Sequence, residues 1–197
     1  MNISKKQIKT VSANNILNMY ESSSLREQSE GKEWYQTANS EAKIISSKTG
    51  YNLSAVCGMI AALSPRNKWT RNIMDVECLI IDSTASVATF HRNKDKAVKI
   101  KDLAEPSFDD VLSILGGDKV RSFYENIYNP LSPDIVTIDS HAIGVWLGSR
   151  AISVSAKGDV YQSIQSDFIK TANELRLIPC QLQAITWLAY RRIHNIR

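Results

Sequence analysis

Two adjacent glycines, Gly116 and Gly117, separate two apolar helical patterns, and this break constrains the fold more than any other feature of the sequence. An apolar run ends just before them at Leu115. A new pattern starts at Asp118, with apolar residues at spacings of three and four that share one helix face: Val120, Phe123, Tyr124 and Ile127. The sequence therefore predicts two helices joined by a tight hairpin.

A third helix is predicted after the turn-rich residues 129–134, with an apolar pattern that runs from Ala142 to Leu147 and closes at Gly148. Asp139 stands at the expected N-cap of this helix, a position that aspartate favours. The positive end of the helix dipole lies there. We therefore expect the Asp139 carboxylate to be ionised.

The glycine hairpin has the properties of a phosphate-binding turn. A turn of two glycines leaves the first amides of the following helix uncovered, and the lack of a Cβ lets a bulky anion approach the backbone. Uncovered amides and the helix dipole together attract phosphate. Lys119 and Arg121 follow and add positive charge. We therefore expect Gly116, Gly117, Lys119 and Arg121 to bind nucleic acid.

Residues 107–148 resemble the helix-hairpin-helix core of the DNA glycosylase superfamily that includes endonuclease III. In that family a glycine-rich hairpin binds a DNA phosphate, a lysine can follow it, and a catalytic aspartate comes about twenty residues later in a V-D-T-H-like segment. Here Lys119 matches the lysine, and Asp139 matches the aspartate within residues 138–141. The hairpin, residues 115–118, is shorter than the family's L-P-G-V-G pattern and has no proline.

The resemblance implies catalytic roles for two residues. Asp139 would stabilise an oxocarbenium-like sugar or deprotonate the attacking nucleophile. Lys119 would be an amine nucleophile, a phosphate contact or a solvated lysine. The sequence has no C-x-x-C pair, so the iron–sulfur cluster of some members is not expected, and we expect no cofactor.

More of the chain resembles a group of small phage-type proteins that share W-Y, A-A-L-S-P-R and T-I-D-x-H segments. These correspond to residues 34–35, 61–66 and 137–141. The likeness suggests a phage or mobile-element source. It would place the protein in the cytoplasm of the host cell.

The rest of the sequence predicts an all-α protein of about nine helices, with no convincing pair of strands. Helices are expected at 3–21, 33–48, 72–82, 94–103 and 159–176. Another begins at Asn52 and forms the central core helix, and Pro179 opens the last. Residues 83–94 are ambiguous. We expect a single domain over 1–197, or two small lobes, that carries the hairpin and the catalytic segment at 107–148.

Further candidate site residues are polar or aromatic side chains at positions favourable for binding. Arg66, Asn67 and Trp69 lie between two core helices and are expected to bind nucleic acid, where Trp69 would stack on a base or simply close a helix end. Asn72, in the same stretch, is a pocket candidate. Gln183, Trp187 and Arg191 share one helix face at spacings of four. Trp34 and His141 are the remaining pocket candidates.

The composition indicates which partners, cellular compartment and metal or membrane contacts to expect. The net charge of +4 permits an anionic partner. Cys57, Cys78 and Cys180 are far apart in apolar surroundings and are expected to be buried thiols in a reducing compartment. The histidines are isolated, so no metal site is expected. An apolar signal core and a long apolar run are both missing, so no membrane span is expected.

These observations favour a DNA-directed enzyme that resembles a helix-hairpin-helix glycosylase and acts on a base or modified base through Asp139. Two alternatives stay open. One is a phage base-modifying transferase built on the same scaffold. The other is a non-catalytic phage protein that binds DNA or protein, because a fold does not by itself determine function.

Overall fold

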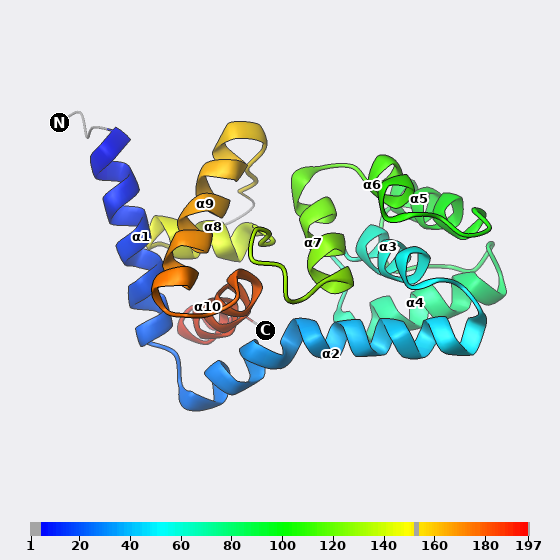
Figure 1. Cartoon of the computed structure of the whole chain (residues 1–197), viewed down its shortest axis with the longest axis horizontal. Coiled ribbons are helices and arrows are strands. Elements are labelled where there is room, and N and C mark those ends of the chain that lie inside the picture. Colours follow the sequence, from blue (N-terminus) through cyan, green and yellow to red (C-terminus); the bar gives the residue numbers. More distant parts are fainter. Residues whose placement is uncertain (1–4, 152–153, 197) are drawn as a thin grey trace. The chain divides into compact units, whose positions relative to one another are not determined.

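The computed structural model describes residues 5–151 and 154–196, and these ranges contain ten helices and no strand (Figure 1). The expected all-α class is confirmed. The helices are α1 (Lys5–Glu21), α2 (Leu25–Thr49), α3 (Leu53–Leu63), α4 (Trp69–Ile81), α5 (His91–Lys101), α6 (Phe108–Ile114), α7 (Asp118–Tyr128), α8 (Ser140–Leu147), α9 (Gly158–Glu174) and α10 (Pro179–Ile193).

The chain divides into two compact units. Unit 1 comprises residues 1–35 and 130–197, and unit 2 comprises residues 36–129. Helix α2 contributes to both, with its first part in unit 1 and its second part in unit 2. The glycine hairpin therefore belongs to unit 2 and Asp139 to unit 1.

Unit 2 is built around α3, the expected central helix. Every residue from Ser54 to Leu63 is buried, and α3 contacts α4, α5, α6 and α7. Asn52 begins the helix because its side chain accepts a hydrogen bond from the Ala55 amide at 2.9 Å. Gly58 allows close packing, since a Cβ there would overlap the Val111 side chain. The predicted start and central position of α3 are confirmed.

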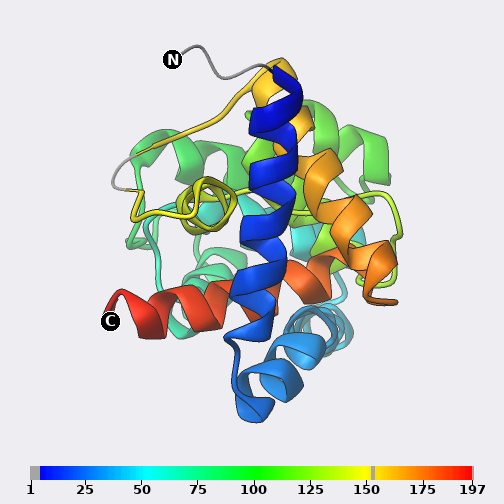
Figure 2. The same cartoon turned by 90° about the vertical axis from the view of Figure 1, so that its left-hand side faces the viewer.

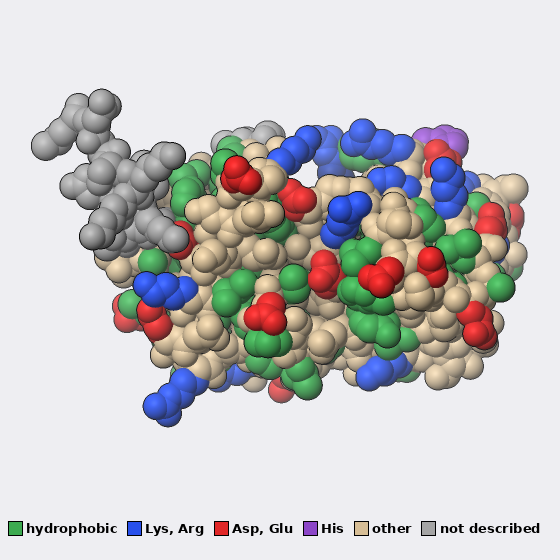
Figure 3. Space-filling model, turned by 45° about the horizontal axis from the view of Figure 1, so that its top comes forward, with side chains coloured by type: hydrophobic (Ala, Val, Ile, Leu, Met, Phe, Trp, Pro, Cys, Tyr) green, Lys and Arg blue, Asp and Glu red, His purple; other side chains and the backbone are tan. Residues whose placement is uncertain are grey.

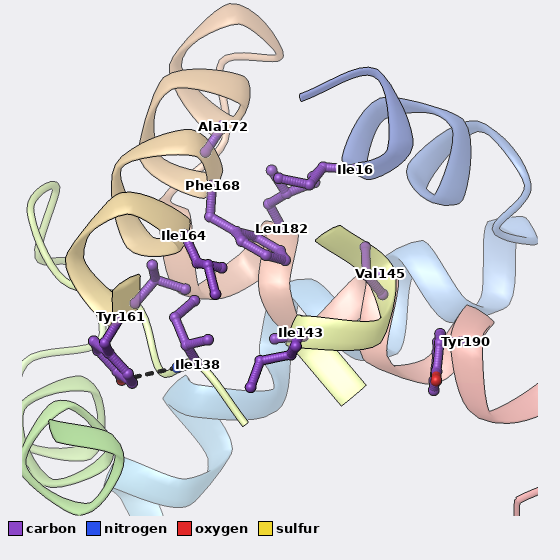
Figure 4. Packing of buried hydrophobic residues seen from close by; sticks show 12 residues of the cluster. Ile16, Ile138, Ile143, Val145, Tyr161, Ile164, Phe168, Ala172, Leu182 and Tyr190 are labelled. Atoms are coloured by element: carbon purple, nitrogen blue, oxygen red, sulfur yellow. Dashed lines mark hydrogen bonds between the residues drawn. The ribbon is translucent and has the colours of Figure 1, made fainter. Parts of the chain in front are cut away.

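Unit 1 packs α1, α8, α9 and α10 around one apolar core (Figures 2 and 4). The core includes Ile16, Ile138, Ile143, Phe168 and Leu182, all buried. Figure 4 shows the hydroxyl of Tyr161 beside Ile138, whose backbone N–H it accepts at 2.9 Å. This bond fixes the extended segment that leads into α8.

The beginning of α2 also packs in unit 1. A Cβ on Gly31 would lie 2.6 Å from the backbone nitrogen of Ile185, so only glycine permits this approach to α10. Glu27 accepts hydrogen bonds from Arg192 of α10 at 2.8 and 3.2 Å. These contacts hold the first turns of α2 against α10.

Three helix starts differ from the predictions. Helix α2 begins at Leu25 rather than at residue 33, because Ser24 and Glu27 form reciprocal cap bonds of 2.7 and 3.2 Å between backbone N–H groups and side chains. Residues 25–33 are mostly polar, so apolar spacing did not reveal this first part. Helices α4 and α5 begin at Trp69 and His91, three residues earlier than expected.

Cys57 and Cys180 are buried as predicted, but Cys78 is exposed on α4 and that prediction was wrong. In an amphipathic helix, a cysteine among apolar residues can still fall on the outer face. None of the helices in the described residues is long and apolar enough to cross a membrane.

Candidate functional site

The hairpin residues 115–118 form the turn between α6 and α7, at the two glycines as predicted. The capping box of Ser107 and Asp110 starts α6, and buried Leu115 ends it. Gly117 is the N-cap of α7 with φ of 83°, a conformation that favours glycine. No described atom would lie within 4 Å of a Cβ at Gly117. The backbone is therefore accessible at the N-terminus of α7.

Basic side chains surround this hairpin. A Cβ on Gly116 would lie 2.6 Å from Nζ of Lys96, so the Lys96 ammonium group lies against the turn. Arg121 donates from Nε to the Leu115 carbonyl at 3.0 Å and thereby braces the hairpin, while Lys119 is exposed. Figure 3 shows lysine and arginine side chains gathered over α5–α7. The acidic Asp118 partly opposes this charge.

Lys96 is a hairpin residue that the sequence analysis missed. It comes from α5, twenty residues before the turn. The only signal was the basic composition of residues 94–101, which does not say which lysine faces the hairpin. The packing of α5 on α6 determines this.

Asp139 is the N-cap of α8 in unit 1, as predicted. Its Oδ1 accepts a hydrogen bond from the Ala142 amide at 2.9 Å. Its Oδ2 lies 3.8 Å from Nδ1 of His141, and the side chain is 17% exposed. One oxygen therefore holds the start of the helix, and the other faces an imidazole.

Aromatic rings of α10 lie beside His141. The ring centroids of His141 lie 5.9 Å from Trp187 and 5.5 Å from Tyr190. The guanidinium of Arg191 stacks over Trp187, 4.4 Å from its ring centroid. The structure thus brings three predicted pocket residues together, His141, Trp187 and Arg191, and of these His141 faces Asp139.

Three buried polar side chains of unit 1, Tyr35, Thr137 and Gln183, lie near Asp139. The Tyr35 hydroxyl donates to Oε1 of Gln183 at 3.0 Å and also forms a hydrogen bond with Thr137. Burial raises the pKa of Tyr35 well above its usual value, and nearby negative charge, including that of Asp139, adds to the effect. Tyr35 is therefore an uncharged donor.

Trp34 and Gln183 near this site were predicted from the sequence, whereas other residues of the site were not. Trp34 packs edge-on against Tyr35 with a centroid distance of 4.7 Å. Gln183 is buried and accepts the hydrogen bond of Tyr35, so it supports Tyr35 and does not line an open pocket. Thr137 was not singled out although it lies in the same T-I-D-x-H segment as Asp139, and no motif or spacing connects Tyr190 to Asp139.

The predicted polar cluster at residues 66–72 lies in unit 2. Asn67 donates to Oδ2 of Asp75 at 2.9 Å, and Trp69 donates to Oε2 of Glu41 at 2.8 Å. Asn72 is 1% exposed and donates to the Ile60 carbonyl at 2.9 Å. These bonds give Asn67, Trp69 and Asn72 structural roles, and the expected nucleic-acid contacts of Arg66, Asn67 and Trp69 stay predictions.

The arrangement around Asp139 suits proton transfer or charge stabilisation by a carboxylate. The described residues contain no group of three or more histidine, cysteine, aspartate or glutamate side chains that could hold a metal ion. Lys119 belongs to unit 2 and Asp139 to unit 1.

The chain belongs to DUF7178, a family of unknown function whose pattern matches residues 1–194. No curated protein and no solved structure matches the chain.

Proposed function

We propose that this DUF7178 chain is a DNA-directed enzyme that resembles the helix-hairpin-helix DNA glycosylases. It binds DNA through the α6–α7 hairpin and acts on a base or modified base through Asp139. The proposal depends chiefly on the Asp139 carboxylate, which is fixed at the start of α8 and partly accessible.

The chemistry follows from the two oxygens of this carboxylate. The Ala142 amide donates to Oδ1, so the Asp139 carboxylate is already held in one orientation before a substrate binds. The helix N-terminus favours its negative charge. A fixed anion stabilises the positive charge that develops on a sugar as the bond to its base breaks. His141, 3.8 Å from Oδ2, is placed to exchange a proton with a nucleophile or leaving group.

The hairpin supplies the DNA contact in this proposal. The exposed backbone at Gly117 and the ammonium of Lys96 attract a phosphate. Lys119, at the second position of α7, serves as a further phosphate contact or as an amine nucleophile. Borohydride reduction separates these roles, because it traps a covalent DNA adduct only if an amine attacks the sugar.

The matched pair Gly117→Val and Gly50→Val tests the hairpin. Both glycines have φ near 80° and open space around Cα, so both variants carry a similar backbone strain. Only a side chain at residue 117 would obstruct a phosphate. We expect Gly117→Val alone to weaken duplex DNA binding and to reduce its salt dependence. Equal affinities for the two variants would contradict the assignment.

A product analysis tests the activity itself. The protein is incubated with duplexes that carry single damaged or modified bases, and the nucleosides and released bases are identified by mass. A free base with an abasic site indicates excision, whereas a nucleoside of higher mass indicates transfer to the base. Binding without either product favours the non-catalytic alternative, in which Asp139 acts only as the cap observed at Ala142.

A further inference from the structure

We propose that unit 2 carries a second DNA site, separate from the hairpin, which binds one unpaired nucleotide. The site is an open groove of about 300 Å³ lined by Arg66, Val87, Ala88, Thr89 and Phe90. The base stacks on Phe90, and the adjoining phosphate pairs with Arg66 and Arg92. This inference rests on the proposed DNA-directed function and adds a specific strand contact to it.

Phe90 presents a partly exposed ring with two cations near it. It is the N-cap of α5 and is 43% exposed. The guanidinium carbons of Arg66 and Arg92 lie 5.4 and 5.6 Å from its ring centroid. An exposed aromatic ring stacks with any base, and neighbouring guanidinium groups bind the phosphate of the same nucleotide. This combination matches a nucleotide unit better than it matches an apolar protein segment.

The backbone places Arg66 in an uncommon conformation. Its φ is 59°, in the left-handed region that non-glycine residues seldom occupy. The Asn67 amide donates to the Ser64 carbonyl at 3.1 Å, and the Thr89 hydroxyl donates to the Pro65 carbonyl at 2.9 Å. The second bond joins the turn that carries Arg66 to the segment that carries Phe90. The two sides of the groove are therefore connected.

One buried carboxylate fixes both sides further. Asp75 of α4 accepts from Asn67 and from the Ala88 amide, each at 2.9 Å, and from Nε of Arg71 at 2.6 Å. The groove is thus held in shape before any ligand binds. Preorganisation of this kind reduces the entropy that a ligand must overcome.

The local charge favours an anion. Arg66 and Arg92 face the ring, whereas the nearby acid Asp95 forms a hydrogen bond with His91 at 3.0 Å. The N-terminal end of α5, an eleven-residue helix, adds positive potential. We infer a single strand because stacking on Phe90 requires an unpaired base, which a duplex does not offer.

The test measures binding of a short labelled single-stranded DNA and of the matching duplex. Phe90→Leu keeps apolar bulk but removes the aromatic face, so we expect at least a fivefold loss of single-strand affinity, equivalent to about 1 kcal/mol of stacking. Phe90→Tyr should stay within about twofold of wild type. Duplex affinity, which depends on the hairpin, should be unchanged in both variants.

Charge is tested with a matched pair of arginines. Arg66→Asn and Arg176→Asn each remove one exposed guanidinium from a left-handed position, with φ of 59° and 57°. Asparagine tolerates this conformation. We expect only Arg66→Asn to lower single-strand affinity strongly and to reduce the salt slope by about one unit.

The outcomes separate this inference from the proposed function. Unchanged single-strand binding in Phe90→Leu, with duplex binding that still depends on Gly117, overturns the groove alone. Equal effects of the two arginine variants also overturn it, because they indicate general charge. Tighter binding of an RNA strand or of an acidic peptide at Phe90 overturns the DNA assignment. Failure of the wild type to bind any DNA overturns both proposals.

Discussion

Replacement of Asp75 by asparagine tests the network that shapes unit 2. The carboxylate is 2% exposed and accepts three hydrogen bonds, from Asn67, Arg71 and Ala88. Asparagine has the same size but carries two N–H donors on one side. In either orientation the new amide group faces at least one of the present donors.

The expected cost follows from these bonds. Hydrogen bonds to a charged group contribute about 1.5–3 kcal/mol each, and neutral bonds about half as much. The Arg71 side chain is half exposed, so water replaces part of its lost partner. Loss of that bond and weakening of the other two give a destabilisation of about 3 kcal/mol. The same free energy makes the locally open state about a hundredfold more populated, so hydrogen exchange of the Ala88 amide should be faster by the same factor.

Urea unfolding and site-resolved hydrogen exchange measure these two effects. The control is Asp95→Asn, which removes a carboxylate that is 55% exposed and bonded to His91. We expect this variant to change stability by no more than about 0.5 kcal/mol. Unchanged exchange at Ala88 in Asp75→Asn would refute the view that this carboxylate holds the groove in shape.

Three further predictions concern other parts of the chain. Gly31→Ala should destabilise unit 1 by about 2 kcal/mol in urea unfolding, because its Cβ would lie 2.6 Å from the Ile185 backbone nitrogen, whereas Ser29→Ala should have little effect. A thiol reagent near pH 8 should modify Cys78 rapidly and the two buried cysteines slowly, because burial raises the pKa of each buried thiol to about 12. Arg192 lowers the pKa of Glu27 below 4.5, so this pair stabilises the fold above that pH and is lost in more acidic solution; Glu27→Gln should make acid titrations of stability less steep.

Local signals predicted much of the fold. Asn52 and Asp139 begin their helices as expected, because a cap depends on a few neighbouring residues. Gly148 likewise ends α8 in the left-handed conformation, with φ of 66°. The same local rule would have found the start of α2 at Ser24 and Glu27 if capping had been weighed before apolar spacing.

The groove and the surroundings of Asp139 depend on contacts between distant residues. Phe90 lies in a segment without helical spacing, and contacts with the turn at Arg66 and with Asp75 hold this segment in place. Tyr35 meets Gln183 across 148 residues of sequence. A single sequence contains no signal for such pairs, so it predicted helices and caps better than the groups that share a site.

The central claim is that the Asp139 carboxylate performs chemistry, and Asp139→Asn tests it most directly. Asparagine also caps helices, so the variant should fold and bind DNA as wild type does. The matched control is Asp110→Asn, which changes another cap carboxylate, in α6. On a base that the wild type processes, we predict that Asp139→Asn lowers turnover at least about a hundredfold and that Asp110→Asn does not. Full turnover in Asp139→Asn would mean that this carboxylate is only a cap and would contradict the proposed mechanism.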